Sequence, residues 1–198
     1  MIHEFIDLKE GINSVYGEPA TGKTTLALML ARDYSKFSKV VYVDTENGFN
    51  VERFKQISRE NYKNCLKNII TFKVKDYKEQ EDIINKLNGI KANLIIIDTI
   101  SMHYRLNLKE DFKNANNKMI NMLKTLRGLN KNNVNILIIN QVYNNFNTNK
   151  VQGVGANMIN KFCKVVLKLE KNPRKIIREK PNKSERLFEI NNEGITIL

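Results

Sequence analysis

Hydrophobic residues in the first two thirds of the chain gather in short blocks rich in Ile and Val. The blocks occupy residues 12–16, 40–44, 69–74, 93–98 and 134–140. Near-continuous apolar runs of this length are typical of strands that are buried on both faces. We therefore expect five buried strands, each separated from the next by more polar sequence.

Helical periodicity fills the sequence between these blocks, and it predicts helices at 23–36, 51–58, 77–88 and 108–128. In the last of them Asn107 and Glu110 occupy capping-box positions, and Gly128 lies near the predicted end. Strands that alternate with helices in this way favour parallel pairing through right-handed crossovers. The expected fold class is α/β, a mainly parallel twisted sheet flanked by helices.

The pattern changes after residue 160. Four segments, "FCKVVLKLEK", "RKIIREK", "RLFEIN" and "ITIL", are joined by the turn-rich sequences "NPR", "KPNKS" and "NNEG". Short strands with turn signals of this kind predict antiparallel strands added to one edge of the sheet. We expect residues 1–198 to form a single domain, with no separate helical domain ahead of it.

Composition narrows the class of protein. Hydrophobic residues make up 41% of the 198 residues and charged residues 27%, and no apolar run approaches the roughly 18 residues of a membrane span. The first ten residues lack both the basic and the apolar segments of a secretory signal, so we expect a cytoplasmic protein without membrane contacts.

Cys65 and Cys163 stand far apart without partners at ligand spacing, which favours two reduced thiols over a disulfide or a zinc site.

The net charge of +12 is unevenly distributed. Residues 1–100 contain 15 Lys and Arg against 14 Asp and Glu, whereas residues 101–198 contain 18 against 7. From Phe112 to Leu169 there is no carboxylate side chain at all. A basic surface is often no more than a solvated one, but a long segment without compensating acids favours a polyanionic partner such as nucleic acid.

The segment "GEPATGKTT" follows the first predicted strand and opens the first predicted helix. That order of strand, loop and helix is the context of a phosphate-binding loop; the alternative is a glycine-containing turn without a ligand. Lys23 would reach the outer phosphates and the Thr24 hydroxyl would ligate Mg²⁺, while the loop backbone would surround the phosphates. The predicted nucleotide-binding residues are Gly17, Glu18, Pro19, Ala20, Thr21, Gly22, Lys23, Thr24 and Thr25.

Three more polar residues lie just past the ends of predicted strands. Asp98 ends "NLIIID", Glu46 follows "VVYVD", and Gln141 follows "VNILIIN". Ligands bind at the carboxyl ends of the strands in open α/β sheets, so we expect these residues at one site. Asp98 would join Thr24 at Mg²⁺, Glu46 would activate water, and Gln141 would sense the γ-phosphate. Each could instead only cap the end of its strand.

Four segments together resemble the ATPase core of the RecA/RadA recombinase family, and most of all its short archaeal paralogs: "GEPATGKTT", "VYVDTENGFNVERFKQI", "NLIIIDTISMHYR", and "INQV" followed by "VQGVGANM". The resemblance runs from about residue 11 to the end. It implies a RecA-type fold, binding of ATP and Mg²⁺ through Lys23, Thr24 and Asp98, Glu46 as the catalytic glutamate, and DNA binding through two loops on one face.

The candidate DNA-binding loops depart from the pattern of the family that the chain resembles. The first retains Arg105 in "YRLNLKED" but lacks the Gly/Arg cluster, and the second is reduced to "YNNFNTNKVQG", with Phe146 available for base stacking and Lys150 for a phosphate. The residues ahead of the first strand contain no Phe-x-x-Ala polymerisation segment. These differences argue against self-sufficient filament formation and strand exchange.

The sequence therefore predicts an ATP-binding accessory protein of DNA repair and homologous recombination, with weak or conditional ATPase activity. Its expected partners are single- or double-stranded DNA and a RadA-type recombinase or other repair proteins. Two alternatives remain open at this point. One is a RecA-like regulatory ATPase that acts on protein partners without DNA, and the other is a non-hydrolysing scaffold that uses bound ATP for stability.

Overall fold

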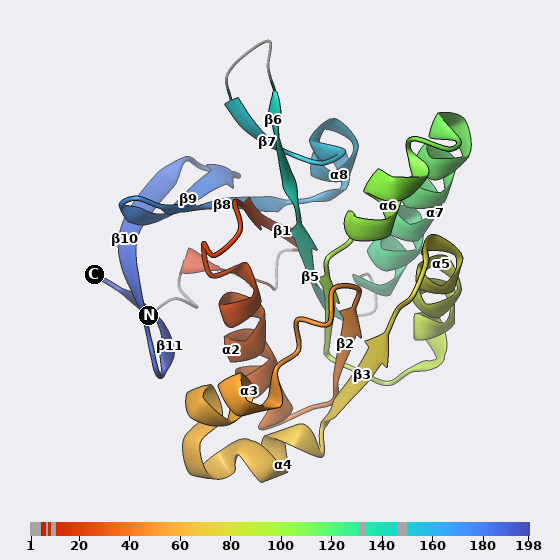
Figure 1. Ribbon diagram of the computed structural model, residues 1–198. Coiled ribbons are helices and arrows are strands. Elements are labelled where there is room, and N and C mark those ends of the chain that lie inside the picture. Colours follow the sequence, from red (N-terminus) through yellow and green to blue (C-terminus); the bar gives the residue numbers. More distant parts are fainter. Residues whose placement is uncertain (1–4, 7, 9–10, 131–133, 146–149) are drawn as a thin grey trace.

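The structure is a computed structural model that describes residues 5–6, 8, 11–130, 134–145 and 150–198. Within these residues nine strands form one sheet, in the order β11-β10-β9-β8-β1-β5-β4-β2-β3 (Figure 1). The strands are β1 (Ile12–Gly17), β2 (Val40–Asp44), β3 (Ile69–Lys73), β4 (Leu94–Asp98), β5 (Asn135–Asn140), β8 (Val165–Lys171), β9 (Arg174–Lys180), β10 (Ser184–Asn191) and β11 (Gly194–Ile197).

The sheet has a parallel part and an antiparallel part. Neighbouring strands from β8 through β1, β5, β4 and β2 to β3 all pair in parallel. Strands β9, β10 and β11 continue from β8 in antiparallel pairs. The predicted α/β class with antiparallel strands at the C-terminal edge is confirmed, and β8 joins the two parts because it pairs in parallel with β1 and antiparallel with β9.

Helices cover both faces of the parallel part (Figure 1). Side chains from α2, α3 and α4 pack into one hydrophobic core, and side chains from α5, α6, α7 and α8 pack into a second core on the opposite face. The helices are α2 (Lys23–Ser35), α3 (Val51–Ser58), α4 (Tyr62–Leu66), α5 (Tyr77–Lys86), α6 (Met102–Asn107), α7 (Phe112–Asn130) and α8 (Ala156–Phe162), with short 3₁₀ turns η2 (Arg59–Asn61) and η3 (Leu87–Gly89).

The strand composition explains this two-sided arrangement. The residues of β2 and of β4 are all buried, so neither face of these central strands is available to water. Cys65 and Cys163 are buried free thiols, one in each core. Among the described residues, no helix combines the length and apolarity that a bilayer crossing needs.

The helix predicted over 108–128 is observed as α7, but α7 begins four residues later, and the short helix α6 ahead of it was not predicted. Asn107 ends α6 and donates its side-chain amide to the carbonyl of His103, so it does not cap α7. The cap of α7 is Asp111, whose carboxylate accepts the backbone N–H of Asn114.

A small hairpin, β6 (Val142–Asn145) with β7 (Lys150–Gly153), rises from the end of β5 next to α8 (Figure 1). The sequence predicted a polar loop here, and the structure pairs its two arms in antiparallel register from Val142 opposite Gly153 to Asn145 opposite Lys150. Phe146, the predicted base-stacking residue, lies outside the described residues. Lys150 lies in β7.

Candidate functional site

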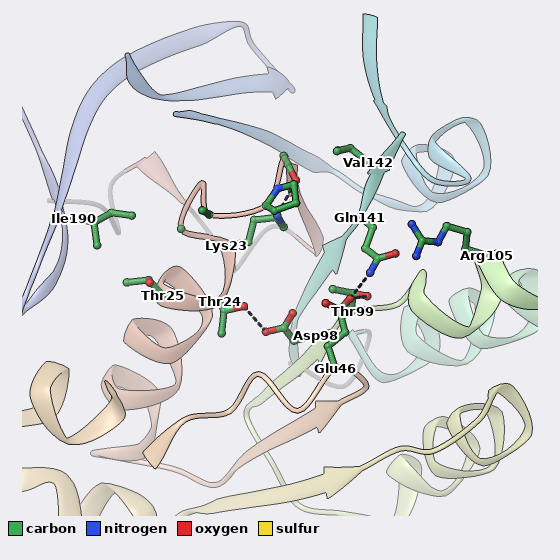
Figure 2. Close-up of a pocket in the computed structure, with 14 residues that line it drawn as sticks. Lys23, Thr24, Thr25, Glu46, Asp98, Thr99, Arg105, Gln141, Val142 and Ile190 are labelled. Atoms are coloured by element: carbon green, nitrogen blue, oxygen red, sulfur yellow. Dashed lines mark hydrogen bonds between the residues drawn. The ribbon is translucent and has the colours of Figure 1, made fainter. Parts of the chain in front are cut away.

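A cavity of about 570 Å³ opens at the carboxyl ends of β1, β4 and β5, where the first turn of α2 begins (Figure 2). Segments far apart in sequence meet here because the parallel strands end at the same edge of the sheet, and the antiparallel strand β10 adds Ile190. The residues that line it are Gly17, Pro19, Ala20, Gly22, Lys23, Thr24, Thr25, Glu46, Asp98, Thr99, Arg105, Gln141, Val142 and Ile190.

The start of α2 forms one wall of the cavity. Gly22 is its N-cap, with a φ of 105° that favours glycine. A Cβ atom here would approach the Cδ1 of Ile190 to 2.8 Å, so the Ile190 side chain would have to shift. The first backbone bond of the helix runs from the N–H of Leu26 to the carbonyl of Gly22, which leaves the preceding amides of the first turn for a ligand.

Lys23 lies beneath the loop, and its ammonium group donates to the carbonyl oxygens of Gly17 at 2.7 Å and of Glu18 at 2.8 Å. Burial lowers the pKa of Lys23, while the nearby carboxylates of Asp98 and Glu46 act in the opposite direction. An ammonium group carries three protons, and two are used by the loop. The third remains for a phosphate oxygen, which would also restore the charged form.

Thr24 and Asp98 lie side by side. The Thr24 hydroxyl donates to Oδ2 of Asp98 at 3.0 Å, and the hydroxyl of Tyr42, on β2, donates to the same oxygen at 2.6 Å. Asp98 is 3% exposed, and burial raises the pKa of its carboxyl to about 6 in spite of these two hydrogen bonds. A buried carboxylate next to a hydroxyl is a donor set that suits a hard divalent cation.

The raised pKa of Asp98 predicts a pH-dependent cost to stability. Because the folded value of about 6 exceeds the ordinary 3.8, this group stabilises the fold at low pH, and the contribution is lost as pH rises through 6. Asn does not titrate, so the stability of Asp98→Asn relative to the unmodified protein should rise by about 2 kcal/mol between about pH 4 and pH 8. Urea unfolding without nucleotide or divalent cation would measure it. Asp82→Asn, an exposed change on α5, is the control; an equal pH dependence in both variants would contradict the prediction.

Glu46 and Gln141 are in direct contact at the wall of the cavity (Figure 2). Oε1 of Glu46 accepts from Nε2 of Gln141 at 2.5 Å and from the hydroxyl of Thr99 at 2.8 Å. The loop that carries Glu46 is held from below by Asp44, whose carboxylate accepts three backbone N–H groups between residues 46 and 49. Glu46 is therefore a fixed carboxylate at the rim of the cavity.

The structure brings most of the sequence-predicted nucleotide and catalytic residues into this one cavity. Of the nine phosphate-loop residues, Glu18 and Thr21 do not line it: Glu18 pairs with Lys171 at 3.0 Å, and the buried Thr21 closes the loop on the carbonyl of Glu18. Arg105, predicted to contact DNA, lines the cavity instead.

Sequence reasoning missed three lining residues. Thr99 follows Asp98 directly and could have been included on that ground; it is tied to the neighbouring strand by Thr45, which exchanges hydrogen bonds with its backbone. Val142 follows Gln141 at the start of the hairpin. Ile190 comes from β10, and nothing in the local sequence links it to the phosphate loop.

The donor set fits a nucleotide phosphate with a divalent cation. Free helix amides and the ammonium group of Lys23 suit phosphate oxygens, and the apolar side chain of Ile190 beside the loop adds a surface without charge. The fold and the site thus define the class: a phosphate-loop nucleotide-binding protein with a RecA-type core.

Comparisons with known proteins agree with this class and narrow it. The family model of Rad51 matches residues 8–197. Proteins named "DNA repair and recombination protein RadB" are similar over most of their length. That of Methanocaldococcus jannaschii is 38% identical over 168 residues, 81% of this chain and 78% of the relative, and that of Methanococcus maripaludis is 35% identical over 181 residues, 87% and 83% respectively.

A solved structure is also similar. The crystal structure of the RadB recombinase superposes with a TM-score of 0.77 at 31% identity, covering 93% of this chain and 89% of that one. The chain belongs to the Rad51 family, as a paralog of the RadB type.

Proposed function

We propose that this protein is an ATP- and Mg²⁺-binding accessory protein of DNA repair and recombination, with slow or conditional ATP hydrolysis. The observation that carries the proposal is the direct contact between Glu46 and Gln141 within the phosphate-loop cavity. Membership in a family whose RadB relatives are named for DNA repair and recombination supports the DNA role. We further propose that residues 1–198 act as one functional unit.

Several polar lining residues have a chemical task in this proposal. The amides at the start of α2 and the ammonium group of Lys23 bind the phosphates, and Thr24 with Asp98 would hold Mg²⁺, which neutralises phosphate charge when bound. Glu46 is the general base that orients water, because its carboxylate is exposed at the cavity rim and held in place by Thr99.

Gln141 connects the nucleotide site to the hairpin. Its side chain contacts Glu46, its backbone N–H donates to the Ser101 hydroxyl, and its carbonyl accepts the N–H of Val154 at the base of the hairpin. A γ-phosphate that competes for the Gln141 amide would thus act on the residue from which β6 starts. This arrangement supports control of hairpin contacts with DNA, or with a recombinase, by the bound nucleotide.

DNA binding should depend on salt. If the acid-free segment from Phe112 to Leu169 neutralises phosphates, the logarithm of affinity should fall linearly with log[salt], by about 0.9 per contact on duplex or about 0.7 on single strands. Lys150→Ala, in the hairpin, should lower that slope by about one unit. Phe146→Ala should weaken single-strand binding by about 1 to 3 kcal/mol through lost stacking and leave the slope unchanged. Fluorescence anisotropy with labelled oligonucleotides, with and without ATP, would measure both effects.

The matched control is Lys67→Ala, an exposed lysine just after α4, which should leave the slope as it is. Absence of any salt-dependent binding by the unmodified protein would favour the regulatory ATPase that acts on protein partners. If Lys67→Ala lowered the salt slope as much as Lys150→Ala, DNA binding would be spread over the surface and not centred on the hairpin.

A further inference from the structure

Arg105, which the sequence analysis assigned to a DNA-binding loop, lies at the phosphate-loop cavity. Its side chain lines the phosphate-loop cavity together with Lys23 and Gln141, and its guanidinium group points toward Gln141 (Figure 2). Within the described part of the chain the guanidinium group has no hydrogen bond or ion pair. It is a cation that faces the site in which a triphosphate is proposed to bind.

The backbone of Arg105 is held firmly although the side chain is exposed. Its N–H bonds to the carbonyl of Ser101 in the first turn of α6. The preceding residue, Tyr104, is 3% exposed and donates its hydroxyl to Asn116 on α7 at 2.8 Å. The side chain of Arg105 therefore starts from a fixed point at the cavity wall, on a helix that begins four residues after β4.

The balance of charged residues in the cavity suggests that Arg105 offsets negative charge there. Its ionisable lining residues are Lys23 and Arg105, which are basic, and Glu46 and Asp98, which are acidic. Without Arg105, Lys23 and the proposed Mg²⁺ would be the cations to offset two carboxylates and the bound triphosphate. Lys23 approaches from the side of the loop, whereas Gln141, the predicted γ-phosphate sensor, lies beside Arg105 at the other side of the cavity.

We propose that Arg105 is a γ-phosphate ligand supplied by the same chain, so that it distinguishes ATP from ADP and is not primarily a DNA contact. This inference rests on the proposed nucleotide binding and names a residue for it. Arg suits the role because its planar fork can donate two hydrogen bonds to one phosphate. In this proposal the β-phosphate is bound by the loop and Lys23. Loss of Arg105 should therefore lower the affinity mainly for a nucleotide that carries the third phosphate.

The test is to titrate Arg105→Ala with a non-hydrolysable ATP analogue and with ADP, each with Mg²⁺ and without DNA, by calorimetry. Affinity for the ATP analogue should fall by about 10-fold to 100-fold, the usual loss for a charge-assisted hydrogen bond, and affinity for ADP by less than about twofold. Arg105→Lys should recover part of the loss because it keeps the charge. Arg127→Ala, which changes an exposed arginine on α7, should change neither affinity. A thermal melt confirms that each variant is folded.

A second measurement separates this role from the one that the sequence suggested. DNA affinity in the absence of nucleotide should be the same for Arg105→Ala and the unmodified protein within about twofold. A variant that loses DNA affinity while both nucleotides bind normally would overturn the proposal, and so would an equal loss for the ATP analogue and ADP. If the unmodified protein binds neither nucleotide, the proposed function itself fails. If the unmodified protein binds both and Arg105→Ala binds both with the same affinities, only the role of Arg105 is overturned.

Discussion

Replacing Lys23 with alanine should abolish measurable nucleotide binding. The ammonium group is the one phosphate-loop cation within the cavity, and its third proton is the one that the loop carbonyls of Gly17 and Glu18 leave unused. Removing it leaves a triphosphate to face the carboxylates of Glu46 and Asp98 without a counter-charge from the loop. Loss of a charge-assisted contact and of the charge itself should lower affinity by at least about 100-fold.

Isothermal titration with ATP and with ADP would measure this loss, and both nucleotides should be affected. Lys36→Ala, at the other end of α2 and exposed to solvent, is the matched control and should bind normally. Since Lys23 also ties the loop carbonyls, a thermal melt should accompany the titration. A folded Lys23→Ala protein with unchanged affinity would remove the nucleotide-site assignment.

Glu46→Gln should bind nucleotide normally and lose most of the hydrolysis that the protein has. In the structure one oxygen of Glu46 accepts both hydrogen bonds, from Gln141 and from Thr99. A glutamine side chain offers the same oxygen, so both contacts survive, and only the basicity is lost. A lost general base typically costs about 100-fold or more.

Phosphate release at saturating ATP, alone and with single-stranded DNA, would measure the effect. Glu52→Gln changes a carboxylate in the first turn of α3, outside the cavity, and should leave the rate unchanged. Equal rates in Glu46→Gln and the unmodified protein would place the base elsewhere, whereas equal but undetectable rates in both would favour a scaffold that binds ATP without hydrolysing it.

The central sheet could be predicted because its strands are apolar on both faces. Each of the five predicted blocks contains an observed strand, from β1 to β5, and the phosphate loop follows β1 as its motif requires. The start of α7 was misplaced for a local reason: Asn107 with Glu110 has the spacing of a capping box, but Asp111 makes the bond that starts α7. Two possible caps four residues apart cannot be ranked without knowing where the helix packs.

The phosphate-loop part of the site could be predicted from the order of strands, loop and helix. The positions of Ile190 and Arg105 at the cavity could not. Asp98, Glu46 and Gln141 each end or follow a strand of one parallel sheet, so topology alone places them together. Ile190 reaches the loop because β10 and β11 bend over α2, where Ile195 also contacts the space beside Gly22. Arg105 reaches it because α6 begins only four residues after the end of β4. Both depend on long-range packing, which periodicity does not report.

The contacts of the last strands have a consequence for how the protein is made. Ile190 lines the nucleotide cavity, Met29 on α2 accepts the backbone N–H of Ile195, and Arg53 on α3 donates to the carbonyl of Asn191. A ribosome that has passed Asp98 has already synthesised the phosphate loop and both proposed metal ligands, yet the growing chain lacks Gln141 and the apolar wall. The nascent protein therefore cannot form the whole cavity until β10 and β11 have emerged and docked on α2. A capacity to bind nucleotide tightly would mark a chain that already includes these two strands.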